Sequence, residues 1–131
     1  MSIGVLIISH DGIGASLLQT ATDALAGCPL EVELLGASRD CDPDQLFDEA
    51  RKRLATLDQG DGVLILTDLY GSTPGNIATR LGESERVRII AGVNLPMLIR
   101  IFNYPNLGLD ELSKKAVNGG QGGIFVVDKS K

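Results

Sequence analysis

Two polar side chains could do chemistry together, because each comes at the end of an apolar run. His10 is the only histidine among the 131 residues and follows the run of residues 3–8. Asp68 follows a second run, residues 63–67. A carboxylate that accepts a hydrogen bond from Nδ1–H of an imidazole fixes its tautomer and leaves Nε2 with a free lone pair. The pair would supply a nucleophile and a charge that stabilises the cation formed on attack.

A stretch of small residues after Asp68 could hold the anion that such a nucleophile attacks. Residues 71–75 read Gly-Ser-Thr-Pro-Gly and lead into a predicted helix, with Thr73 as its cap. Free backbone N–H groups and the helix dipole favour phosphate at such a terminus. We therefore expect Gly71, Ser72 and Thr73 to bind a phosphoryl group. The stretch matches neither a nucleotide-binding P-loop nor the Gly-x-Ser-x-Gly turn of serine hydrolases.

The two apolar runs predict the strands that position His10 and Asp68. Neither run alternates with polar residues, which is typical of strands buried on both faces in a parallel sheet. Ligands and chemistry collect at the carboxyl ends of such strands. If the two strands are adjacent and parallel, their ends lie on one rim, about 5 Å apart.

The rest of the chain alternates between strand and helix patterns. Residues 30–34 predict a half-exposed strand and residues 87–91 a fourth strand. Capping residues and apolar spacing predict helices that start after Gly14, at Asp42, at Thr73, at Asn94 and at Leu109. This alternation predicts an α/β fold in three layers, a doubly wound and mostly parallel sheet flanked by helices.

The end of the chain departs from this alternation. The last helix is predicted to end at Asn118 and Gly119, and residues 119–123 to form a flexible glycine connection. The apolar residues 124–127 then predict a short edge strand. It would pair within the chain or be exchanged with a second subunit in a dimer.

Length, charge and the positions of the cysteines argue against several classes of protein. The 131 residues, 44% apolar and with a net charge of −5, predict one domain over residues 1–131. Without a basic block, nucleic acid is not an expected partner. No apolar run reaches the ~20 residues of a membrane span, and no signal peptide is indicated. Cys28 and Cys41 are isolated, so we expect free thiols in a reducing cytoplasm, with neither a metal site nor a cofactor.

Three segments, residues 3–12, 68–74 and 91–98, resemble a known family. They are similar to the A domain (enzyme IIA, EIIA) of the mannose family of the bacterial phosphoenolpyruvate-dependent sugar phosphotransferase system (PTS). The resemblance covers nearly the whole chain. It implies that the carrier protein HPr phosphorylates His10 on Nε2, that Asp68 orients His10, and that Ser72 with the surrounding backbone holds the phosphoryl group. It also implies a homodimer whose last strand crosses to the partner subunit.

The acceptor histidine of such a carrier must be reachable by another protein. We expect apolar side chains on the rim to form a partner surface, namely Tyr70, Leu95 and Met97. Many family members have tryptophan where Tyr70 stands. Family transporters often continue into a B domain (EIIB), whereas this chain stops at Lys131. The phosphoryl group would then pass to a separate EIIB subunit or act as a regulatory signal.

Three alternatives stay open at this point. The phosphoryl-carrier subunit of phosphoenolpyruvate-dependent dihydroxyacetone kinase also uses a histidine after its first strand, although residues 71–74 and 92–96 look more like the mannose family. A response-regulator receiver would be phosphorylated on Asp68, but it needs a pair of acids after the first strand and a lysine after the fifth. A non-catalytic binding module would leave His10 unphosphorylated.

Overall fold

The computed structural model describes residues 2–84 and 86–128. In this part of the chain, four strands form one parallel sheet in the order β2-β1-β3-β4. The strands are β1 (Gly4–His10), β2 (Val32–Ala37), β3 (Val63–Thr67) and β4 (Val87–Ala91). The helices are α1 (Ile13–Leu25), α2 (Pro43–Leu57), α3 (Thr73–Leu81), α4 (Leu95–Phe102) and α5 (Leu109–Gly122). The predicted α/β class with a parallel sheet is confirmed.

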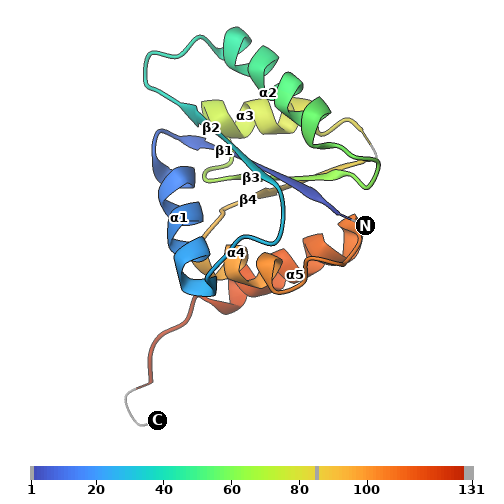
Figure 1. Cartoon of the computed structure of the whole chain (residues 1–131). Helices are drawn as coiled ribbons and strands as arrows, with labels where there is room; N and C mark the ends of the chain where they lie inside the picture. Colours follow the sequence, from blue (N-terminus) through green and yellow to red (C-terminus); the bar gives the residue numbers. More distant parts are fainter. Residues whose placement is uncertain (1, 85, 129–131) are drawn as a thin grey trace.

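Helices cover both faces of the sheet and make three layers (Figure 1). Helices α1, α4 and α5 pack on one face, and α2 and α3 pack on the other. Val5 and Ile7 of β1 belong to the first core, whereas Leu6 and Ile8 belong to the second. All four side chains are fully buried. The run shows no polar alternation because both of its faces meet apolar helices.

The register of the sheet brings the ends of three strands together. His10 pairs with Ala37 of β2, and Ile8 pairs with Thr67 of β3. Asp68 therefore follows β3 at the level of Ser9, one residue before His10 in β1. The strands β1 and β3 are adjacent and parallel, which is the arrangement that the sequence argument required.

The last helix is longer than the sequence predicts. The glycines predict an end at Gly119, whereas α5 continues to Gly122. A Cβ on Gly119 would lie only 2.5 Å from Cβ of Arg100, and one on Gly120 only 2.9 Å from Cε of Met97. The absence of side chains lets α5 approach α4 closely. These glycines therefore serve helix packing and not a flexible connection.

We expect Gly119→Ala to destabilise the chain by about 1–3 kcal/mol, because the added methyl group would overlap Arg100. This reverses the usual helix preference, in which alanine is better than glycine by about 1 kcal/mol. The matched control is Gly122→Ala in the same helix, where a Cβ would have no neighbour within 4 Å. Urea unfolding compares the two variants. A Gly119→Ala protein as stable as its control would contradict the close packing of α4 and α5.

Residues 124–127 do not join the sheet of their own chain. They follow α5 and project from the helix layer on the side away from the sheet (Figure 1). Of the two predicted arrangements, an edge strand paired within the chain is therefore wrong, because α5 runs on to Gly122 and carries this segment away from the sheet edges. Exchange of this segment with a second subunit stays a prediction. All four side chains are largely exposed: Ile124 74%, Phe125 72%, Val126 94% and Val127 74%.

Candidate functional site

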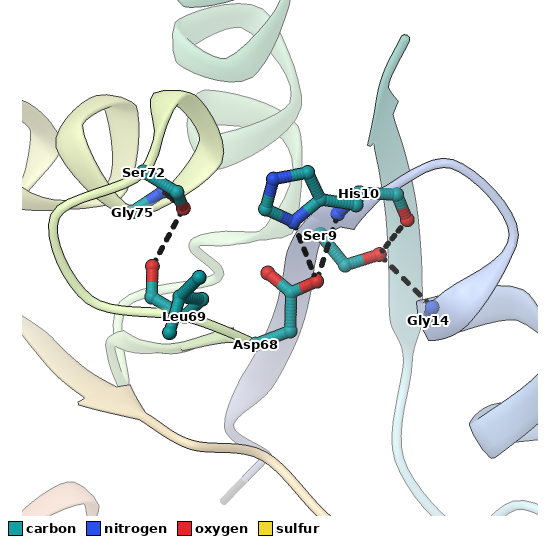
Figure 2. A network of polar contacts seen from close by, with 7 residues as sticks. All are labelled: Ser9, His10, Gly14, Asp68, Leu69, Ser72 and Gly75. Atoms are coloured by element: carbon teal, nitrogen blue, oxygen red, sulfur yellow. Dashed lines mark hydrogen bonds and ion pairs between the residues drawn. The ribbon is translucent and has the colours of Figure 1, made fainter. Parts of the chain in front are cut away.

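His10 and Asp68 meet at the carboxyl ends of β1 and β3 (Figure 2). One carboxylate oxygen, Oδ2 of Asp68, accepts a hydrogen bond from the backbone N–H of His10 at 3.0 Å and lies 2.9 Å from Nδ1 of the same residue. An ionised carboxylate can only accept, so Nδ1 carries the proton in this contact. In the neutral ring, Nε2 is then the free acceptor. Figure 2 shows this second nitrogen on the side of the ring turned away from Asp68.

The surroundings of the two side chains differ. The side chain of His10 is 45% exposed, whereas that of Asp68 is 10% exposed. Burial raises the pKa of the Asp68 carboxyl, but the hydrogen bonds from the ring and the backbone of His10 outweigh it and hold this pKa below its ordinary value. Asp68 is therefore a carboxylate at neutral pH. It can stabilise positive charge on the imidazole while His10 stays accessible.

The turn from β1 into α1 fixes the backbone of His10. Oγ of Ser9 donates a hydrogen bond to the His10 carbonyl at 2.9 Å and accepts one from the backbone N–H of Gly14 at 2.9 Å. Gly12 has a φ of +80°, which glycine adopts without strain. A Cβ on Gly14 would lie 2.9 Å from Cγ2 of Ile7, so the first turn of α1 lies directly on β1. These contacts fix the backbone on the C-terminal side of His10.

Ser72, and not Thr73, caps helix α3. Its Oγ accepts a hydrogen bond from the backbone N–H of Gly75 at 3.3 Å and donates one to the Leu69 carbonyl at 2.6 Å (Figure 2). The predicted cap is wrong by one residue, because Thr73 already lies in the first turn of the helix. The Ser72 hydroxyl thus holds the loop that connects Asp68 to α3.

An open hollow of about 540 Å³ borders His10. It lies between the β1–α1 turn, the β2–α2 loop and the first turn of α3, and its lining residues are His10, Asp11, Ala37, Ser38, Arg39, Thr73 and Pro74. The helix terminus favours an anion in this hollow. Thr73 lines the hollow, whereas Ser72 caps the helix and Gly71 turns the loop with a φ of +83°. Binding of a phosphoryl group by these three residues stays a prediction.

The structure changes the predicted partner surface. Tyr70 is 77% exposed beside the site, and the neighbouring Leu69 is 60% exposed. Leu95 is half-buried at the start of α4. Met97 is 4% exposed and belongs to the core between α4, α5 and the sheet. Met97 therefore offers no area to a partner and is removed from this surface. The helical period of α4 turns it inward, two residues after Leu95.

Sequence reasoning missed two residues at this edge of the sheet. Ser9 is a polar residue that ends a buried run just before a glycine turn, and this pattern could have identified its role. Arg39 lines the hollow, but the alternating pattern predicted the second strand only to Leu34. Strand β2 continues through Gly36 and Ala37, which places Arg39 at the same rim as His10.

Residues 2–84 and 86–128 contain no cluster of three or more histidine, cysteine or acidic side chains that could hold a metal ion. No helix in these residues is long and apolar enough to cross a membrane. Both Cys28 and Cys41 are free thiols.

Known proteins are similar to this chain in sequence and in fold. A family model described as "EIIA-man: PTS system fructose IIA component" matches residues 4–117. The chain is 33% identical over 127 residues to the PTS system mannose-specific EIIAB component of Escherichia coli K12, which covers 95% of this chain and 39% of that protein. It is 33% identical over 69 residues to the PTS system fructose-specific EIIA component of Bacillus subtilis, covering 51% of this chain and 47% of that protein.

A solved structure agrees with this match at the level of the fold. The mannose/sorbose specific IIA subunit of the phosphotransferase system from Enterococcus faecalis superposes with a TM-score of 0.84 at 24% identity, over 98% of this chain and 96% of that chain. The chain spans about two fifths of the length of the mannose-specific relatives it matches. From the family match over residues 4–117, the chain belongs to the mannose-type enzyme IIA (EIIA-man) family of the sugar phosphotransferase system.

Proposed function

We propose that this chain is a phosphoryl carrier that accepts a phosphoryl group from phosphorylated HPr on Nε2 of His10. The observation that carries the proposal is the contact between Nδ1 of His10 and Oδ2 of Asp68, which leaves Nε2 as the free nitrogen beside the hollow. The bond between phosphorus and the donor histidine breaks as a bond from phosphorus to Nε2 forms. The Nδ1 proton stays between His10 and Asp68, so the imidazolium produced on attack is next to a carboxylate.

The phosphoryl group then passes to a separate EIIB subunit or acts as a regulatory signal. Phosphoryl transfer between two proteins requires an exposed acceptor on an accessible rim, and the 45% exposed side chain of His10 meets this requirement. Tyr70 and Leu69 offer exposed apolar area for docking next to the site. The position of Tyr70 and Leu69 next to His10 supports one docking surface that HPr and the protein that receives the phosphoryl group would both use.

Intact-mass measurement tests the carrier function. The chain is incubated with phosphoenolpyruvate, enzyme I and HPr, and control reactions omit each component in turn. We expect one added phosphoryl group, in the complete reaction only, that is lost in acid and stable in alkali, as phosphohistidine is. A group lost in alkali would indicate an acyl phosphate on an aspartate. No added mass with active donors would favour a non-catalytic binding module.

We further propose a homodimer in which residues 124–127 pack on the partner subunit. Four consecutive apolar side chains, each more than 70% exposed, are costly to leave in water. Sedimentation equilibrium is expected to give twice the chain mass for the wild type and one chain mass for Phe125→Glu. The control is Gln121→Glu, an exposed position on α5 that leaves the apolar segment unchanged. A monomeric wild type would contradict the proposal.

A further inference from the structure

One cation lines the hollow beside His10, and the carrier function as proposed assigns it no role. Arg39 lies on the loop between β2 and α2, two residues after Ala37, which is the register partner of His10. It is exposed and shares the hollow with His10 and Thr73. A phosphoryl group on Nε2 would therefore share this hollow with Arg39 and with the start of α3.

Arg39 is available to a ligand, unlike most arginines of the chain. In residues 2–84 and 86–128 it forms no ion pair, even with Asp11, which lines the same hollow. Three other arginines form ion pairs: Arg53 with Glu33 and Glu49, Arg86 with Asp58, and Arg88 with Asp110. The guanidinium groups of Arg51 and Arg80 lie over the ring of Phe47. The position of Arg39 in the hollow is thus not explained by an ion pair within the described residues.

The negative charges around His10 would repel a phosphoryl group, and Arg39 could offset them. Asp68 and Asp11 are two acidic groups at or beside the hollow, and a phosphoryl group adds about −1.5 to −2 charge near neutral pH. Repulsion between these charges would disfavour the phosphorylated state. Among the described residues, Arg39 is the only arginine or lysine that lines the hollow. The planar guanidinium can bind two phosphoryl oxygens at once, which a lysine ammonium cannot match in geometry.

We propose that Arg39 is a phosphoryl-binding residue, which contacts the phosphoryl group on His10 and offsets the negative charge of Asp11 and Asp68. The inference rests on the proposed carrier function and adds a specific residue to it. It assigns the guanidinium to the phosphoryl group itself and not to the surface of a partner protein.

A small-molecule donor separates these two roles. Phosphoramidate transfers its phosphoryl group without a docking surface: the P–N bond breaks, ammonia leaves, and a bond from phosphorus to Nε2 of His10 forms. The variants are Arg39→Gln, Arg39→Lys and the control Arg51→Gln, whose guanidinium lies over Phe47 on α2. For each protein, the rates of phosphorylation by phosphoramidate and by phosphorylated HPr are measured. The pH titration of the ³¹P resonance of the phosphorylated protein is the spectroscopic readout.

We expect Arg39→Gln to slow both reactions about tenfold and to move the ³¹P titration to higher pH, since a nearby cation stabilises the dianion. Arg39→Lys should show smaller changes in both the rates and the ³¹P titration than Arg39→Gln, and Arg51→Gln should match the wild type. Unchanged phosphoramidate kinetics and an unchanged ³¹P titration in Arg39→Gln would overturn the inference. Slowing with phosphorylated HPr alone would also overturn it, because Arg39 would then serve docking. A wild type that neither donor phosphorylates would instead refute the carrier function on which the inference rests.

Discussion

His10→Ala is expected to abolish phosphorylation by phosphorylated HPr, because it removes the only imidazole in the chain. The fold should persist, since the side chain is 45% exposed and its main partner is one oxygen of Asp68. Loss of that charge-assisted hydrogen bond is expected to cost about 1–3 kcal/mol of unfolding free energy. Intact mass measures phosphorylation, and thermal unfolding measures stability. A folded His10→Ala protein that still gains a phosphoryl group would refute the site.

His10→Asn is the matched control for the loss of the hydrogen bond. The side-chain amide of asparagine can place a donor close to the position of Nδ1 and so satisfy Oδ2 of Asp68. It offers no nucleophile at the position of Nε2. We therefore expect His10→Asn to be more stable than His10→Ala and equally inactive. This comparison separates the chemistry of the imidazole from its structural contact.

Asp68→Asn is expected to slow phosphoryl transfer on the order of 100-fold without weakening the binding of HPr. The neutral amide cannot stabilise the imidazolium, and its N–H group can face Nδ1 and favour the wrong tautomer. Rapid-quench measurement of phosphoryl transfer gives the rate, and titration calorimetry with unphosphorylated HPr gives the affinity. Asp61→Asn is a control, because this carboxylate accepts a hydrogen bond from the backbone of Ser2. Transfer at the wild-type rate would remove Asp68 from the mechanism.

Asp68→Asn should also change how stability depends on pH. The pKa of Asp68 is lowered in the folded chain, so its contribution is present above the unfolded pKa of ~3.9 and is lost as the pH falls through the lower, folded value. The difference in unfolding free energy between wild type and Asp68→Asn should therefore shrink below about pH 4. Asp58, whose pKa is also lowered, is common to both proteins and cancels in this difference.

The central part of the fold could be predicted because local pattern and tertiary environment agree there. The apolar run before His10 has no polar residues, and in the structure both of its faces are buried. The predicted caps at Asp42 and Asn94 are confirmed, since each side chain accepts a hydrogen bond from its helix. The proximity of His10 and Asp68 followed from one assumption, that their strands are adjacent and parallel. The sheet order satisfies that assumption.

The features that could not be predicted depend on contacts between segments far apart in the chain. Glycine at positions 119 and 120 disfavours a helix locally, but close packing on α4 requires it. The burial of Met97 depends on the same interface. Arg39 was missed because Gly36 and Ala37 weaken the strand pattern, although pairing with β1 keeps them in the sheet.

Oδ2 of Asp68 contacts both the backbone N–H and the ring Nδ1 of His10, so the orientation of the imidazole depends on correct folding of the sheet. This oxygen accepts a hydrogen bond from the backbone N–H of His10, the last residue of β1, and lies against Nδ1 of the same residue. The imidazole is therefore oriented only when β1 and β3 have paired in register. A slip of one residue would move His10 to the other side of the sheet. Under the proposed function, a chain with unpaired or misaligned strands presents the donor with an unoriented histidine. The rate of phosphorylation would thus report the fraction of native molecules in a preparation, as an activity-based measure of correct folding.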